Sequence, residues 1–183
     1  MSWLTPAAVL KAAMIETESL RLRRPEIDDL DAIHAMRSNP DVVRYLGGRT
    51  LSREEAWHRL TRIAGHWTLR GYGMFVVVEK HSGAFVGEIG LFDGCRGLSP
   101  DFDNAPEAGW ILAPAAHGKG YASEAAAAAH RWFAETHGAG RSVCIIAPEN
   151  LASLRVAQKL GYKGFGQVEY QGHPVLMLER IPD

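Results

Sequence analysis

Apolar and polar residues recur along this chain with two different periods, and the changes of period mark the predicted elements. Alternating or continuously apolar runs predict strands, and apolar residues three and four positions apart predict helices. A helix over 52–69 begins at a capping box from Ser52 to Glu55. The predicted strands are 20–23, 74–79, 84–92, 107–113, 141–146, 168–170 and 175–180, and the other predicted helices are 28–37, 120–137 and 150–160.

The order of these elements is β-α-α-β-β-β-α-β-α-β-β. Hairpins stand beside strand–helix units, which predicts an α/β fold with one mixed, mostly antiparallel sheet flanked by helices. Segments 39–51 and 93–106 are predicted as loops. Residues 1–14 are predicted as an N-terminal extension with a short helix over 6–14, before a single domain over 15–183, and Met14 is an alternative start.

Composition narrows the function classes. The chain has 183 residues, with 20 Lys and Arg against 21 Asp and Glu, and this balance argues against a general nucleic-acid binder. Cys95 and Cys144 lie in no CxxC pattern and the eight histidines show no paired spacing, so no metal site is predicted. No apolar run reaches the roughly 20 residues that span a bilayer. Without a signal-peptide pattern, the prediction is a cytoplasmic protein that does not enter a membrane. The sequence does not indicate an oligomeric state.

One segment carries the most informative chemistry. Residues 114–125 read Pro-Ala-Ala-His-Gly-Lys-Gly-Tyr-Ala-Ser-Glu-Ala, a glycine-rich turn between a predicted strand and a predicted helix. Gly118 and Gly120 have no Cβ, so the backbone can approach a ligand closely, and the free N–H groups of a first helical turn favour anions. The P-loop pattern is absent, and the three-glycine dinucleotide pattern lacks its third glycine, which disfavours a Rossmann site.

At this point the chain resembles the GNAT superfamily of acyl-CoA-dependent N-acetyltransferases, whose diphosphate motif is Gln/Arg-x-x-Gly-x-Gly/Ala. Residues 117–122 read His-Gly-Lys-Gly-Tyr-Ala, and the wider wording over 118–125 is similar to the RimJ/RimL branch, which acetylates ribosomal-protein N-termini. The resemblance covers roughly residues 16–181 and implies a fold whose strands before and after the central helix splay to admit the pantetheine arm of acetyl-CoA. Segments 17–23, 86–91, 107–112, 148–153 and 160–162 agree in the same order.

The resemblance also implies which residues bind acetyl-CoA, the acyl donor. The backbone of Trp110, Ile111 and Leu112 would pair with the pantetheine amides as an added strand would. Asn150 would hydrogen-bond the pantetheine arm, and Ser153, one helical turn further on, would meet the arm or the sulfur. The diphosphate would lie on the N–H groups of the turn, in a set formed by His117, Gly118, Lys119, Gly120, Tyr121, Ala122 and Ser123.

Two positions depart from the family pattern. The first motif position is usually Gln or Arg and is His117 here. Some relatives carry a tyrosine acid seven residues after the asparagine, where this chain has Ala157, so a tyrosine acid at that position is excluded. Ser153 or a water is left to protonate the thiolate, which is also a fair leaving group unaided because thiol pKa values lie near about 8.5.

No nucleophile motif supports a covalent route, so the implied reaction is direct attack of an amine on the thioester. The amine must be neutral. Deprotonating an α-amine with a pKa of about 7.7–8.0 at pH 7 costs roughly 1 kcal/mol, whereas a lysine with a pKa of about 10.4 costs roughly 4.6 kcal/mol. A weak base acting through water suffices for an α-amine. Glu107 is the first candidate and Glu88 the second.

The predicted function is therefore acetyl transfer to a primary amine, with a protein N-terminal α-amine preferred. A small-molecule amine acetyltransferase and a noncatalytic acyl-CoA-binding module are the alternatives. Charge is unevenly distributed: residues 115–163 hold six Lys and Arg against three Asp and Glu, and the rest holds 14 against 18. The positively charged segment 115–163 includes Lys119, Arg155 and Lys159, which are candidate partners for the phosphates. The remaining, negatively charged part of the chain includes Asp93, Asp101, Asp103 and Glu107. These residues predict an acidic acceptor side, which suits a cationic amine.

Overall fold

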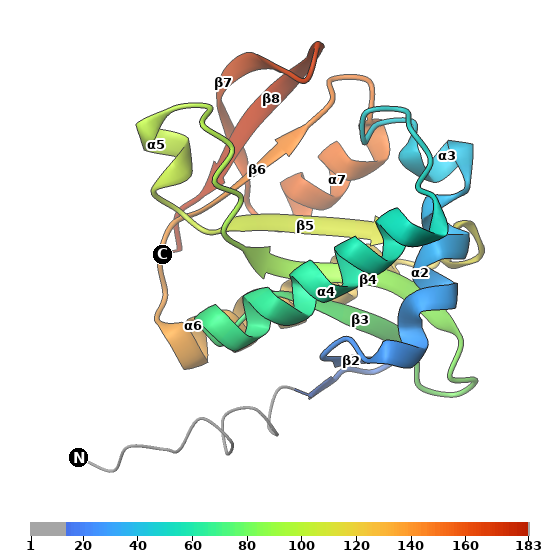
Figure 1. Ribbon diagram of the computed structural model, residues 1–183. Coiled ribbons are helices and arrows are strands. Elements are labelled where there is room, and N and C mark those ends of the chain that lie inside the picture. Colours follow the sequence, from blue (N-terminus) through green and yellow to red (C-terminus); the bar gives the residue numbers. More distant parts are fainter. Residues whose placement is uncertain (1–13, 183) are drawn as a thin grey trace.

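A single eight-stranded sheet organises the computed structural model, which describes residues 14–182 (Figure 1). The strand order is β1-β2-β3-β4-β5-β6-β8-β7, and every neighbouring pair is antiparallel except β5 and β6. The predicted α/β fold with a mixed, mostly antiparallel sheet is confirmed. The strands are β1 (Ile15–Glu16), β2 (Leu20–Arg23), β3 (Met74–Glu79), β4 (Phe85–Phe92), β5 (Glu107–Leu112), β6 (Ser142–Ile146), β7 (Lys163–Tyr170) and β8 (His173–Arg180).

The helices follow the apolar periodicity closely. Ser52 accepts a hydrogen bond from the Glu55 N–H while the Glu55 side chain accepts one from the Ser52 N–H, so the capping box that the sequence predicts is present. Among residues 14–182, no helix combines the length and the apolar composition that crossing a membrane requires. The helices are α2 (Leu30–Arg37), α3 (Pro40–Val43), α4 (Arg53–Arg70), α5 (Pro100–Asp103), α6 (Tyr121–His137) and α7 (Leu151–Lys159), with 3-10 turns η1 (Ile27–Asp29) and η2 (Pro114–Ala116).

Two of the predicted loops contain short helices. Asn39 directly precedes Pro40, and its side chain accepts a hydrogen bond from the Asp41 N–H. Ser99 directly precedes Pro100, and its hydroxyl accepts a hydrogen bond from the Phe102 N–H. Each is a polar cap followed by proline at the first helical position, a local signal that outweighs the loop composition. The closing strand β7 also begins earlier than predicted, at Lys163. The predicted extension lies outside the described residues except for Met14.

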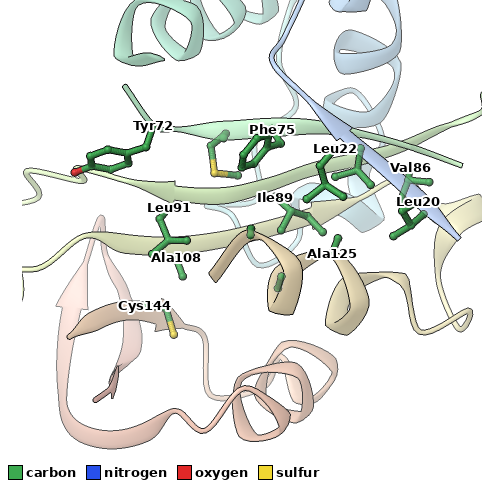
Figure 2. Packing of buried hydrophobic residues seen from close by; sticks show 14 of the residues in the cluster. Leu20, Leu22, Tyr72, Phe75, Val86, Ile89, Leu91, Ala108, Ala125 and Cys144 are labelled. Carbon is green, nitrogen blue, oxygen red and sulfur yellow. The ribbon is translucent and has the colours of Figure 1, made fainter. Parts of the chain in front are cut away.

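Helices cover both faces of the sheet. In Figure 1, α2 and α4 lie in front of the strands and α6 lies behind them. Leu20, Val86 and Ala125 meet where β2, β4 and α6 come together (Figure 2). On the α4 side, Trp67 is 2% exposed and its indole N–H donates to the Met74 carbonyl at 2.8 Å, so its one polar group is satisfied.

The parallel pair β5 and β6 separates almost at once. Its only register pair is Glu107 with Val143, although β5 keeps six consecutive partners on β4 and β6 keeps five on β8. Because each strand is held on its outer side, the gap between them is a fixed opening in the sheet rather than a frayed edge. The splayed strand pair that the family resemblance implies is thus confirmed.

An ion-pair cluster joins the two front helices to the centre of the sheet. Glu88 on β4 is 1% exposed, and its carboxylate is bound by Arg37 of α2 at 3.2 Å and by Arg59 of α4 at 2.9 Å. Burial works to raise the pKa of Glu88, but the charges and hydrogen bonds of the two arginines outweigh it and hold the pKa below its ordinary value. Glu88 is therefore an anchor on which both helices converge.

Replacing this anchor should destabilise the fold. Glu88→Gln leaves two guanidinium groups without their shared anion, so the free energy of unfolding should fall by about 3–5 kcal/mol in urea denaturation. In the wild type, the stabilisation from the Glu88 ion pairs is complete at pH values above the pKa that Glu88 has in the unfolded chain. It is lost as the pH falls through the lower pKa that Glu88 has in the folded protein. The variant should consequently lose less stability on acidification.

The matched control is Glu135→Gln, because Glu135 is exposed on α6. Its free energy of unfolding should stay within about 0.5 kcal/mol of wild type. Equal stability of the two variants would contradict the anchoring role of Glu88.

Candidate active site

The opening between β5 and β6 belongs to a cavity of about 1270 Å³. Its walls come from β5, the glycine turn, β6, the start of α7, the β7–β8 hairpin and one face of α4. The structure places nearly all of the predicted site residues on this wall. Those that line the cavity are Glu107, Trp110, Ile111, Leu112, His117, Gly118, Gly120, Tyr121, Ala122, Ser123, Asn150 and Ser153. The lining does not include Lys119 or Glu88.

The glycine turn presents backbone donors to the cavity. Gly118 and Gly120 adopt φ values of +77° and +80°, and a Cβ built on either meets nothing within 4 Å. Gly120 is the residue preceding α6, and no side chain caps the first turn of that helix. Its first N–H groups therefore remain available to an anion beside the positive end of the helix dipole. The His117 ring nitrogen Nε2 lies 3.1 Å from the Leu112 carbonyl, joining the turn to the end of β5.

Side chains of the first turn fix α6 to the sheet. The Tyr121 hydroxyl donates to Glu79 at 2.5 Å, and the Lys119 ammonium lies 3.8 Å from the same carboxylate. Glu124 accepts hydrogen bonds from the Thr17 hydroxyl at 2.6 Å and the Ser19 N–H at 2.8 Å. Because these contacts reach β3 and the turn between β1 and β2, the N-terminus of α6 is held in place before any ligand arrives.

The start of α7 contributes an amide and a hydroxyl. Asn150 caps this helix, with its Oδ1 accepting from the Ser153 N–H at 3.1 Å. The Asn150 NH₂ group has no partner among residues 14–182 and lies on the cavity wall. The amide oxygen of Asn150 therefore caps the helix, while its NH₂ group stays free to donate a hydrogen bond.

Glu107 is buried at the start of β5, with 3% of its surface exposed. Arg96 binds both carboxylate oxygens, through Nε at 2.6 Å and Nη2 at 2.7 Å, and its Nη1 donates to the Tyr170 hydroxyl at 2.8 Å. A Cβ on Gly94 would lie 2.2 Å from the Glu107 carboxylate, so a larger residue there would displace that carboxylate from its present position. Burial raises the pKa of Glu107 above its ordinary value, with the Arg96 guanidinium opposing that rise.

Arg96 and Tyr170 are not among the residues predicted from the sequence. Arg96 lies in the irregular segment 93–106, where no periodicity points toward the site. Tyr170 is the last residue of β7 and reaches the cavity through the fold of the closing hairpin. Arg96 reaches Glu107 across 11 residues of irregular chain, and Tyr170 joins Arg96 from 74 residues away, so no local sequence pattern indicates either contact.

The two candidate bases occupy the same face of the sheet at different depths. Glu88 pairs with Ile111 and Glu107 pairs with Phe92 across the β4–β5 ladder, which puts both carboxylates on one face and four positions apart. At about 3.3 Å per residue, this separation is roughly 13 Å along the strands. A single reacting amine therefore cannot contact both.

The acidic acceptor side expected from the charge distribution is not what the structure shows. Asp93 is paired with Arg70 at 2.6 Å, Asp101 with Arg141 at 3.3 Å and Glu107 with Arg96. Asp103 accepts from the backbone N–H groups of Arg96 and Gly97. Counting charges along the sequence could not reveal that arginine side chains pair with three of these four carboxylates in the fold.

Known proteins share this architecture. A family model described as an acetyltransferase (GNAT) domain matches residues 19–163. YkkB of Bacillus subtilis (strain 168) is 30% identical over 172 residues, which make up 90% of this chain and 93% of YkkB. A solved structure from Bordetella pertussis, described as a GNAT-family acetyltransferase, is 36% identical in sequence and has a TM-score of 0.83. The match covers 91% of this chain and 98% of the Bordetella chain.

A fold comparison adds a structure that holds the cofactor. RimL, a ribosomal L7/L12 alpha-N-protein acetyltransferase solved in complex with coenzyme A, shares the fold with a TM-score of 0.73. The two sequences are 22% identical, and the match covers 92% of this chain and 97% of the RimL chain. The splayed strands, the glycine turn and the family match agree. The chain belongs to the GNAT family and is an acetyl-CoA-dependent acetyltransferase.

Proposed function

We propose that the enzyme acetylates the N-terminal α-amine of a protein. The observation that carries this proposal is that arginines hold both candidate carboxylates, Glu107 through Arg96 and Glu88 through Arg37 and Arg59. Such a site supplies at most a weak base. It suits an α-amine, whose deprotonation at pH 7 costs roughly 1 kcal/mol, better than a lysine or polyamine nitrogen, which costs roughly 4.6 kcal/mol.

The proposed donor site extends from the glycine turn into the opening of the sheet. The N–H groups of 118–123 would hold the diphosphate, and the backbone of 110–112, which has no β6 partner, would pair with the pantetheine amides. The free NH₂ of Asn150 would donate to the pantetheine arm. Lys119, Arg155 and Lys159 would add positive charge around the phosphates, and Arg155 and Lys159 line the cavity.

The proposed reaction forms a bond from the amine nitrogen to the acetyl carbonyl carbon and breaks the bond from that carbon to sulfur. Glu107 takes the amine proton through a water, and its burial-raised pKa brings it nearer to the value that suits this task. A backbone N–H of 110–112 polarises the thioester carbonyl. Ser153 or a water returns a proton to the thiolate. Ala157 is fully buried and offers no acid.

Glu88 is better suited to positioning than to proton transfer. Its pKa is held low by two arginines, and it does not line the cavity. We therefore place the base at Glu107 and assign to Glu88 the support of α2 and α4 behind the acceptor side.

The main alternative is acetylation of a small amine. A thiol-release assay with acetyl-CoA should show turnover with N-terminally free peptides and much less with polyamines or free amino acids. Faster turnover with a small amine than with any peptide would contradict the proposal. Tight coenzyme A binding without thiol release would favour a noncatalytic module.

Glu107→Gln should change the pH profile as well as the rate. In the wild type, log kcat/KM should fall with slope 1 below the α-amine pKa of about 7.7–8.0 and with slope 2 below the Glu107 pKa. The variant should keep the first limb and lose the second, with kcat reduced by about 10²–10⁴-fold. Coenzyme A affinity, measured by calorimetry, should stay unchanged. An unaltered pH profile would remove Glu107 from the mechanism.

Gly120→Ala should weaken coenzyme A binding by more than its cost in stability explains. The left-handed backbone at Gly120 costs a residue with a Cβ about 1–2 kcal/mol, and a shifted turn would move N–H groups away from the diphosphate. We expect the coenzyme A Kd to rise at least about tenfold.

Gly83→Ala is the matched control for this experiment. Gly83 has a similar φ of +71°, no neighbour within 4 Å of a built Cβ, and a place in the β3–β4 hairpin away from the cavity. The two variants should lose similar stability, and only Gly120→Ala should lose affinity. Equal affinities would show that the turn does not hold the diphosphate.

A further inference from the structure

Three guanidinium groups line the cavity near one buried carboxylate, and two of them bind it. Arg37 and Arg59 both bind Glu88, and Arg62 follows Arg59 by three residues on the same face of α4. All three arginines line the cavity, whereas Glu88 lies beneath them and is fully buried. This wall of the cavity therefore carries more positive than negative charge.

Arg62 is the member of the group that is free to bind something else. It makes no ion pair or hydrogen bond within residues 14–182, although it lies on the cavity wall and its side chain is accessible. Beside it, the Nε of Arg37 is buried and also lacks a hydrogen-bond partner. Unpartnered donors next to unneutralised positive charge form a site for an anion.

The surrounding charges place Arg62 between the two carboxylate clusters. Burial and the charge of Arg59 lower the pKa of Arg62, and Arg96 acts on it in the same direction, while Glu88 opposes them. Arg62 thus lies within electrostatic reach of Arg59 and Glu88 and also of Arg96, the partner of Glu107. Repulsion among these arginines is relieved when an anion binds.

The nearby carboxylates do not provide that anion. Asp93 and Glu107 line the same cavity but are engaged by Arg70 and Arg96. Asp41 and Glu149 also line the cavity, and neither forms an ion pair with Arg62 within residues 14–182. Arg44 stacks over the Tyr45 ring, its guanidinium carbon 5.4 Å from the ring centroid. The positive wall therefore faces the acceptor without a counter-ion of its own at Arg62.

We propose that this wall selects acceptors with an acidic N-terminus, in which an Asp or Glu side chain near the reacting α-amine binds Arg62. The inference rests on the proposed function and specifies its substrate class. With the amine at Glu107, the roughly 13 Å between Glu107 and Glu88 along β4 and β5 equals about four residues of extended chain. The acidic side chain is therefore expected at the second to fourth position of the acceptor.

The test compares matched peptides that differ only in charge. One series carries Ser-Glu-Glu-Glu at its N-terminus, the second Ser-Gln-Gln-Gln and the third Ser-Lys-Lys-Lys, each followed by the same neutral sequence. The wild type should acetylate the acidic peptide with a kcat/KM at least about tenfold above that for the neutral one, the increment expected for a charge-assisted hydrogen bond. The basic peptide should be slowest.

Variants at Arg62 then identify the source of the preference. Arg62→Gln should bring the acidic and neutral peptides within about threefold of each other, and Arg62→Glu should favour the basic peptide. Folding should be unaffected because Arg62 is accessible and has no partner in the described part of the chain. The control is Arg53→Gln, which alters an exposed arginine of the same helix outside the cavity and should retain the wild-type preference.

The outcomes separate this inference from the proposed function. Equal kcat/KM for acidic and neutral peptides, or an acidic preference that survives Arg62→Gln, overturns the anion site while leaving N-terminal acetylation intact. No acetylation of any peptide α-amine, with coenzyme A still bound, overturns the proposed function itself. Free glutamate or aspartate acetylated faster than the acidic peptide would overturn the peptide acceptor and assign Arg62 to a small carboxylate.

Discussion

The separation of β5 from β6 after a single pairing, Glu107 with Val143, is the constraint on which the site depends. Two continuously paired strands would satisfy each other's backbone groups and leave no edge for a ligand. Here the ladders to β4 and β8 keep the strands rigid on their outer sides while their inner sides face a cavity. The same pairing positions Glu107 at the point where β5 and β6 begin to separate. A backbone irregularity thus creates the edge proposed to bind the pantetheine arm and locates the proposed base.

Arginines determine what this opening can do chemically. They hold the buried carboxylates in place, and they remove the acidic surface that charge counting along the sequence had suggested. A cleft with a weak base and a positive wall is poorly matched to a polyamine, because polycations meet like charge and need a stronger base. It is better matched to an α-amine on an acidic chain. The proposed specificity and the proposed mechanism therefore follow from the same side chains.

The sequence predicted the parts of the fold that have local causes. The capping box at Ser52, the glycine turn after β5 and the apolar periods predicted the long elements. The residues that the ordered motifs nominated as donor-binding mostly line one cavity. The short helices α3 and α5 were not predicted, because each is a single capped turn within a segment that has the composition of a loop. Contacts between separate segments could not be predicted. Arg96 binds Glu107 and Tyr170, and Arg37 and Arg59 bind Glu88, only after the sheet has formed.

The most direct measurement is the site of acetylation on a peptide that offers two amines. A peptide with a free N-terminus, acidic residues at positions two to four and an internal lysine is incubated with isotopically labelled acetyl-CoA, and tandem mass spectrometry locates the label. A weak base at Glu107 predicts label on the α-nitrogen, with the lysine unmodified. Label on the lysine Nζ instead would contradict it, because the site would then have to supply a much stronger base than the arginine-bound carboxylates provide.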